Sequence, residues 1–285
     1  GGAHALKFDI KTYNINPSIA LKATEMVSIG AGISIQRMEV EYSRLAAVVS
    51  PALATTKATL SAGDTSWGWN VGALFTLSPS TKVGVSYRSK IRHTLEGDLS
   101  VRGPAQGASA ALTSGSAKAF VELPDTFILS VAQQLNDKWE MLGDVSWTGW
   151  SSIDKVDIVR TSGSLSGRTV QTLDTAFRDS WRYALGANYR FSDTLKLKFG
   201  VAYDQTPVPD TAHRLVSLPD ANRTWLTTGA QIKLDKASTV DLGAAYIQVS
   251  ENHIDNDQSA LGRGRVKGVY DARVWILGAQ YSMAF

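Results

Sequence analysis

The sequence predicts an all-β protein, a transmembrane antiparallel up-and-down β-barrel, and three observations support this class. Apolar and polar side chains alternate over segments of roughly ten residues, the length of a tilted strand that crosses a bilayer. The links between these segments are alternately short and long. The final segment carries a wholly apolar row, made of Trp275, Leu277, Ala279, Tyr281, Met283 and Phe285. Because side chains alternate across a strand, this row forms one face, which a strand in a lipid-embedded barrel requires.

The composition fits a membrane β-barrel better than a protein with membrane helices or one stabilised by disulfides. The chain has 285 residues, 44% of them hydrophobic, and a mean hydropathy of −0.09. No uninterrupted apolar run approaches the roughly 18 residues typical of a membrane helix. Cysteine is absent, which excludes disulfide scaffolds and thiolate metal sites. The net charge of +3 comes from scattered Lys and Arg, so we expect no nucleic-acid partner.

About eleven alternating segments follow one another along the chain. They are 5–23 (interrupted near 14–17), 27–42, 67–77, 81–99, 118–134, 139–160, 181–191, 195–204, 225–234, 239–249 and 269–285. Short turns are expected at 24–26, 78–80, 136–138, 192–194 and 235–238. Long links are expected at 43–66, 97–117, 161–180, 206–224 and 250–268. Strict alternation of short and long links is typical of an up-and-down barrel, whereas the alternative, a soluble β-sandwich, does not require it.

Aromatic and charged residues have predictable places in such a wall. Tryptophans near strand ends suit an interfacial girdle; they are Trp67, Trp69, Trp139, Trp147, Trp150, Trp181, Trp225 and Trp275. Period-two alternation predicts a second group on the lumen side, made of Arg88, Lys90, Arg92, Arg182, Arg190, Lys196 and Lys198. Most of these charges are expected to be balanced by acidic residues, and a few could attract a carboxylate.

No catalytic, metal-binding or cofactor-binding site is predicted, and we expect the protein not to be an enzyme. The four histidines, His4, His93, His213 and His253, lie on different segments without metal-ligand spacing. Residues 163–167 (GSLSG) lack the central serine of a nucleophile elbow.

Several motifs resemble one family, the outer-membrane long-chain fatty-acid and hydrocarbon transporters of the FadL/TodX type. In chain order these are TSWGWN (65–70), VSYRS (85–89), ELPD (122–125), WTGWS (147–151), FRDSWRYALG (177–186), DQTPVP (204–209), PDANRTW (219–225) and YSMAF (281–285). The resemblance implies a fourteen-stranded barrel with an N-terminal hatch, located in the outer membrane of a Gram-negative bacterium. The chain has about eleven such segments instead of fourteen. Residues 1–285 are therefore expected to form a single barrel domain that lacks the hatch and first strands.

The resemblance also implies passive uptake of long-chain fatty acids or aromatic hydrocarbons, with capture in an apolar pocket near the outer loops and gated release. Outer-membrane lipid and lipopolysaccharide are the other expected partners, and the protein is expected to be a monomer. Arg44 matches the arginine that meets the acid head group, and Leu60 matches an apolar pocket residue. The partnering lysine falls near Leu173, so Arg168 and Arg178 are the expected substitutes.

Two other functions remain open from the sequence. An outer-membrane lipid hydrolase would need a Ser–His pair, and none occurs at a recognisable spacing. A general water-filled porin would conduct ions steadily, which a plugged transporter would not.

Overall fold

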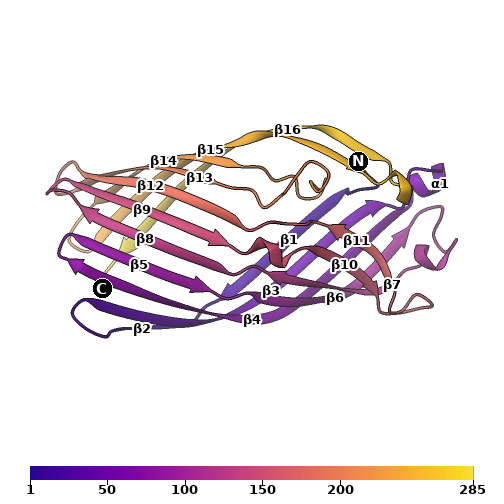
Figure 1. The fold of residues 1–285 in the computed structure, drawn as a ribbon, viewed down its shortest axis with the longest axis horizontal. Helices are drawn as coiled ribbons and strands as arrows, with labels where there is room; N and C mark the ends of the chain where they lie inside the picture. The colour runs from indigo at the N-terminus through magenta and orange to yellow at the C-terminus, as the bar shows by residue number, and fades with distance from the viewer. Residues whose placement is uncertain (285) are drawn as a thin grey trace.

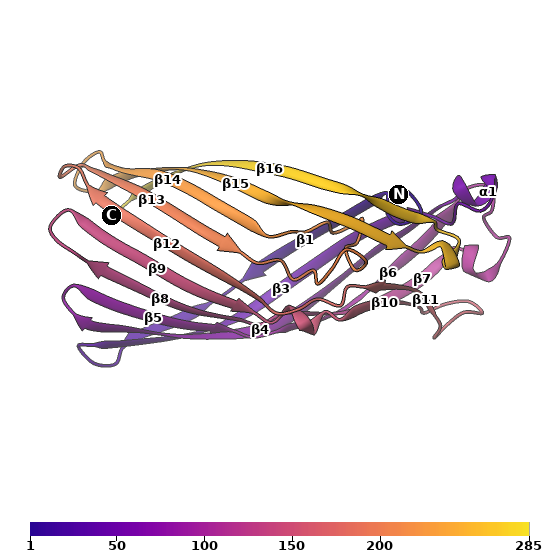
Figure 2. The same ribbon diagram turned by 45° about the horizontal axis from the view of Figure 1, so that its top comes forward.

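The computed structural model describes residues 1–284 and contains one large antiparallel sheet, curled into an elongated barrel wall of tilted strands (Figures 1 and 2). Along the wall the strands follow the order β11-β10-β7-β6-β4-β5-β8-β9-β12-β13-β14-β15-β16, and β3 joins β1 and β2 to β4. No helix among these residues is long and apolar enough to cross a membrane.

The strands are β1 (Lys7–Ile15), β2 (Ser18–Lys22), β3 (Val27–Leu45), β4 (Lys57–Ser78), β5 (Thr81–Arg88), β6 (Ile91–Arg102), β7 (Gly115–Leu123), β8 (Thr126–Gln134), β9 (Trp139–Thr148), β10 (Lys155–Arg160), β11 (Thr169–Asp174), β12 (Ser180–Arg190), β13 (Leu195–Asp204), β14 (Arg223–Lys233), β15 (Ser238–Asp257) and β16 (Arg265–Met283). Short helices are α1 (Pro51–Ala54), η1 (Ala110–Leu112), η2 (Trp150–Ser152) and η3 (Ser259–Leu261).

In five places, two consecutive strands together make one pass along the wall. β1 and β2 both pair with β3, while β5 and β6 both pair with the same edge of β4. In the same way, one pass each is formed by β7 with β8, by β9 with β10 and by β11 with β12. The sixteen strands therefore make eleven passes, which confirms the segments that alternation predicts.

The two ends of the barrel differ in the links that they carry. Tight turns join β2 to β3, β4 to β5, β8 to β9, β12 to β13 and β14 to β15 at the end where the C-terminus lies (Figure 1). The longer links leave the wall toward the opposite end, as predicted, although link 205–222 folds back inside the wall (Figure 1). Most of them are shorter than expected. β3 and β4 extend into the predicted link 43–66, β15 and β16 into 250–268, and β11 forms inside 161–180.

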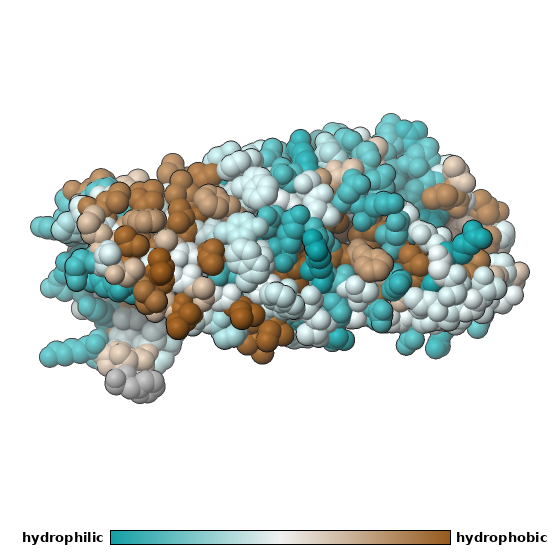
Figure 3. Space-filling model, turned by 60° about the horizontal axis from the view of Figure 1, so that its bottom comes forward, coloured by the Kyte–Doolittle hydropathy of each residue, from teal (hydrophilic) through white to brown (hydrophobic). Residues whose placement is uncertain are grey.

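A band of exposed apolar side chains surrounds the half of the wall that carries the tight turns. Figure 3 shows brown residues gathered over this half and many more hydrophilic residues beyond it. Members of the band include Ile33, Trp69, Val71, Phe127, Leu129, Trp181, Leu185, Val201, Leu226, Leu242, Trp275 and Leu277. On the outward face of β3, Ile33 and Ile35 are followed by Arg37, Glu39 and Glu41, so the apolar band ends between Ile35 and Arg37. A surface of this kind matches the hydrocarbon core of a bilayer.

Four adjacent passes are interrupted next to one another at the edge of this band. The breaks are Ser89–Lys90, Pro124–Asp125, 149–154 and 175–179, and we call them the break level. On the tight-turn side of the break level, which we call below it, β5, β8, β9 and β12 have 8, 9, 10 and 11 residues. These lengths are close to the roughly 9–11 residues that span a bilayer. β15 has a bulge between Val249 and Asn252, whereas the ladder between β3 and β4 runs without a register shift.

The break at Ser89–Lys90 reverses the inward and outward assignment of the residues that follow it. Arg88 is paired with Asn70 on the lumen side. Beyond the break, Ile91 and His93 are buried, at 6% and 1% exposure, so they face inward. The side chain of Arg92 is 82% exposed and pairs with Glu122, as does Lys90. The prediction that Lys90 and Arg92 line the lumen is therefore wrong, because it carried a period of two across a strand break.

The two edges of the sheet, β16 and β1 with β2, do not pair with each other within residues 1–284. They approach at the long-loop end, where His4 Nε2 lies 2.9 Å from the carbonyl oxygen of Gly264. Nearby, the backbone N–H of Val48 donates to the carbonyl of Gly262 over 2.8 Å. The segment before β1 and the link after β3 are thus both attached to the β15–β16 link.

Candidate functional site: an apolar cavity inside the wall

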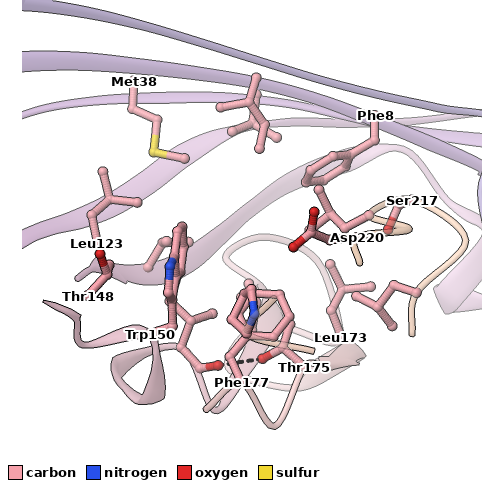
Figure 4. Close-up of a pocket in the computed structure, with 18 of the residues that line it drawn as sticks. Phe8, Met38, Leu123, Thr148, Trp150, Leu173, Thr175, Phe177, Ser217 and Asp220 are labelled. Atoms are coloured by element: carbon pink, nitrogen blue, oxygen red, sulfur yellow. Dashed lines mark hydrogen bonds between the residues drawn. The ribbon is translucent and has the colours of Figure 1, made fainter. Parts of the chain in front are cut away.

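A cavity of about 750 Å³ lies inside the wall above the break level, that is, on its long-loop side. The lining of the cavity is mainly apolar (Figure 4). This volume is within the roughly 300–1,000 Å³ of small-molecule pockets. Its apolar side chains from the strands are Phe8, Ile10, Met38, Val40, Tyr42, Leu60, Ala62, Leu95, Ala119, Val121, Leu123, Val156, Ile158 and Leu173. They come from β1, β3, β4, β6, β7, β10 and β11, so the upper wall as a whole forms the site.

Alternation places these residues on the lumen side. Met38 and Tyr42 on β3 are 4% exposed, Leu60 on β4 is 5% exposed and Leu95 on β6 is 3% exposed. These residues belong to the main buried cluster of the molecule. Their outward neighbours are charged, as at Glu39, because this part of the wall lies outside the apolar band. The core of the upper barrel and the wall of the cavity are therefore the same surface.

The breaks contribute a second, aromatic part of the lining. Trp150 and Phe177 meet edge to face with ring centroids 6.0 Å apart, and both point into the cavity (Figure 4). Thr175 fixes this contact by donating from Oγ1 to the carbonyl of Ile153 over 2.6 Å. The next residue, Ala176, has φ 43°, a left-handed conformation that is uncommon without glycine. Trp150 therefore lines the cavity and does not belong to the predicted girdle.

The link 205–222 folds inward and forms one side of the cavity. It contributes Pro207, Leu215, Leu218 and Pro219, and its Val208 is 2% exposed. On one flank the Pro207 carbonyl accepts from the N–H of Arg178 over 2.9 Å. On the other flank it is attached to β15, where Asp255 N–H donates to the carbonyl of Thr211 over 2.9 Å. The segment closes the upper wall between β11 and β15, where no strand lies.

Ion pairs close the end of the cavity nearest the membrane band. Arg223 lies 3.1 Å from Asp204 and 3.6 Å from Asp220, and Arg182 lies 3.7 Å from Asp144. Three carboxylates thus face two guanidinium groups, so this floor has no spare positive charge. The guanidinium of Arg182 also lies 5.6 Å from the ring centre of Trp225. Trp225 therefore faces the lumen, which corrects its predicted place in the girdle.

A hydrogen-bonded chain occupies the opposite, upper end. Gln171 donates to Tyr42 Oη over 2.8 Å and accepts from Arg44 Nε over 2.6 Å. Arg44 also donates to the carbonyls of Leu45 and Ala46, each over 2.9 Å. Burial lowers the pKa of Arg44 to about 10, and the nearby charge of Arg263 acts in the same direction. Both arginines lie well beyond the apolar band, and Arg44, with a pKa of about 10, is charged at neutral pH.

The residues predicted for the site are only partly brought together. Leu60 lines the cavity, and Arg44 lies just above it, two residues beyond the lining residue Tyr42. Arg168 and Arg178 are exposed and do not line the cavity, whereas Leu173 does. Sequence reasoning did not find Phe8, Tyr42 or the 205–222 link. Only the apolar residues and prolines of that link could have indicated that it packs inward.

Comparison with known proteins decides the family. A family model described as outer membrane protein transport protein (OMPP1/FadL/TodX) matches residues 1–285. The chain belongs to this family. The long-chain fatty acid transport protein of Salmonella typhi is 26% identical over 310 residues, with 100% of this chain and 68% of the relative covered. Outer membrane protein P1 of Haemophilus influenzae is 26% identical, with coverages of 87% and 58%.

Solved structures show the same fold. A FadL homologue from Pseudomonas aeruginosa matches with a TM-score of 0.89 at 24% identity, over 99% of this chain and 70% of that one. The Ralstonia pickettii toluene transporter TbuX matches with a TM-score of 0.70 at 16% identity, over 97% and 68%. As a FadL/TodX family member, the protein is a β-barrel of the bacterial outer membrane and serves transport. The Salmonella typhi relative is named as a transport protein and the Ralstonia pickettii structure as a toluene transporter.

Proposed function

We propose that this FadL/TodX family protein takes up long-chain fatty acids or other hydrophobic compounds by binding them in the apolar cavity and releasing them through a gated step. The observation that carries the proposal is an apolar cavity of about 750 Å³ enclosed by an outer-membrane wall. Relatives named for long-chain fatty acids and for toluene support hydrophobic substrates. No cofactor or energy source is needed, because an apolar compound moves down its own gradient. We further propose that residues 1–285 act as a single barrel domain.

The cavity favours hydrophobic compounds because its apolar wall replaces water around them. Burial of each methylene contributes about 0.8 kcal/mol, so a long acyl chain gains the most. The ion-paired floor formed by Arg182, Arg223 and their acidic partners gives no comparable gain. We infer that release is directed sideways into lipid, and that it needs a movement of the wall.

The upper end of the cavity suits a polar head group. In this proposal Leu60 contacts the apolar chain and Arg44 binds a carboxylate by a charge-assisted hydrogen bond. Replacement Arg44→Ala should weaken binding of a fatty acid more than binding of the matching alcohol. An equal loss for both compounds would mean that Arg44 does not read the charge.

The direct test is equilibrium binding of labelled oleate and of toluene to the protein in detergent. A cavity-filling replacement, Ala119→Trp, should abolish binding of both, because Ala119 is 3% exposed and lines the cavity. The outward neighbour replacement Phe120→Trp is the matched control. Neither compound binding to the wild type would refute the proposal. Large steady ion currents in a planar bilayer would favour a porin, and lipid hydrolysis in detergent would favour a hydrolase.

A further inference from the structure

Four arginines outside the apolar band are at least partly buried and have no carboxylate partner among residues 1–284: Arg44, Arg160, Arg214 and Arg263. Two of them have a structural explanation. Arg160 donates to the carbonyls of Ala110, Ala111 and Thr113, and Arg214 donates to those of Asp220 and His253. Arg44 also donates to Gln171 and to two backbone carbonyls, but it differs from Arg160 and Arg214 because a second arginine without a carboxylate partner, Arg263, lies in the same region of the molecule.

The β15–β16 link brings Arg263 to Arg44 from the other edge of the sheet. Gly262 on one side of Arg263 accepts from the Val48 N–H, and an added Cβ at Gly262 would lie 3.6 Å from Ala47 Cβ. On the other side, Gly264 contacts the ring of His4, whose carbonyl accepts from Tyr42 Oη over 2.6 Å. Tyr42 in turn accepts from Gln171, the partner of Arg44. Gly264 is thus joined through His4 to the hydrogen-bonded chain that positions Arg44, and Gly262 contacts the segment that follows Arg44.

The two guanidinium groups leave positive charge unbalanced at this end. Arg263 donates to Gln258 Oε1 over 3.2 Å, and no carboxylate within the described residues lies at ion-pair distance from it or from Arg44. Burial lowers the pKa of Arg263, as it does that of Arg44, and the charge of Arg263 lowers the pKa of Arg44 further. Two like charges in a partly dry site repel each other, and a bound anion relieves this repulsion.

We propose that Arg263 and Arg44 together form an anion site that binds the carboxylate of an amphiphile whose chain lies in the cavity. This inference rests on the proposed uptake of hydrophobic compounds and specifies their orientation. Arg44 follows Tyr42 by two residues on the same face of β3, about 6–7 Å along the strand, so the carboxylate sits just above the apolar wall. The opposite end has three carboxylates for two arginines and would repel an acid.

The test compares an acid with its uncharged analogue. Equilibrium dissociation constants of oleate and oleyl alcohol are measured at pH 8 for the wild type, Arg263→Gln, Arg263→Lys and Arg265→Gln. Arg265 is the matched control, because it lies two residues away, is exposed and pairs with Asp255 on the outer surface. Arg263→Gln should weaken oleate binding about tenfold, equivalent to ~1.4 kcal/mol, and leave the alcohol within about twofold. Arg263→Lys should restore most of the lost affinity, and Arg265→Gln should change neither compound.

The outcomes separate this inference from the proposed function. If the wild type binds the alcohol and oleate, but Arg263→Gln leaves oleate unchanged, the role of Arg263 is overturned while uptake stands. An equal loss of both compounds in Arg263→Gln would also overturn it, since the link would then act through packing and not through charge. If the wild type binds neither compound, the proposed function itself fails.

Discussion

Arg223 reaches two acidic residues at once, with its guanidinium 3.1 Å from Asp204 and 3.6 Å from Asp220. Asp204 ends β13 and Arg223 begins β14, so this contact lies where the inward link 205–222 leaves and rejoins the wall. Thr206 strengthens it by donating from Oγ1 to Asp220 over 2.7 Å. The ion pairs that form the floor of the cavity therefore also hold both ends of link 205–222.

Replacement Arg223→Leu should destabilise the protein by about 1–3 kcal/mol, because it removes the guanidinium that pairs with two partly buried carboxylates. The matched replacement Arg190→Leu removes an exposed pair with Asp193 in a turn and should cost less than about 1 kcal/mol. Urea unfolding in a detergent that supports reversible folding measures both. Similar losses in the two variants would show that the floor is as well hydrated as a surface turn.

The length of the acyl chain should control affinity. Removing two methylenes from a bound fatty acid loses up to about 1.6 kcal/mol, or roughly 15-fold in the dissociation constant, if both are buried. Saturated acids that differ by two carbons, titrated into the protein in detergent, give this slope. An affinity that does not change with chain length would mean that the chain lies outside the cavity.

The break at Ser89–Lys90 should be visible by chemical labelling. The chain has no cysteine, so a single introduced thiol gives a clean signal. On intact cells, a bulky membrane-impermeant maleimide should label Arg92→Cys rapidly, because this side chain points outward above the apolar band. Val71→Cys, which points outward inside the band, should stay unlabelled. Faster labelling of Arg88→Cys than of Arg92→Cys would show that the strand does not change phase at the break.

Acid should loosen the contact between His4 and the β15–β16 link. Burial lowers the pKa of His4 from its ordinary value of 6.5, so the folded state resists protonation more than the unfolded state does. The stabilisation from neutral His4 is complete above pH 6.5 and is lost as the pH falls through 6.5 toward the lower folded-state value. The difference in melting temperature between the wild type and His4→Gln should therefore shrink from pH 8 to pH 5. A constant difference would show that His4 does not titrate in this contact.

Local periodicity was sufficient to predict the wall. Alternation identified all eleven passes, and the change from turn residues to long polar links identified which end carries the loops. It also anticipated the interruption near Pro17, since proline has no N–H for the sheet ladder. The predicted lumen-side direction was correct at Arg182 and Lys198, which lie in continuous strands and pair with Asp144 and Asp241 in the lumen.

Contacts between distant segments could not be predicted in the same way. Nothing near Trp150 or Trp225 in the sequence shows that one meets Phe177 and the other lies beneath Arg182. The approach of Arg263 to Arg44 depends on how far the sheet curls, which is a property of all the strands together. A local sequence pattern shows on which face of its strand a residue lies. The cavity, however, is formed by residues that only the closure of the whole wall brings together.

The alignment of the strand breaks also affects how the family can vary in length. In an unbroken strand, one added or lost residue would turn every following side chain to the opposite face. At 149–154 or 175–179 the ladder already restarts, so a change in length there leaves the lipid-facing half below it undisturbed. Insertions and deletions there can therefore reshape the apolar cavity while the lipid-facing strands keep their register.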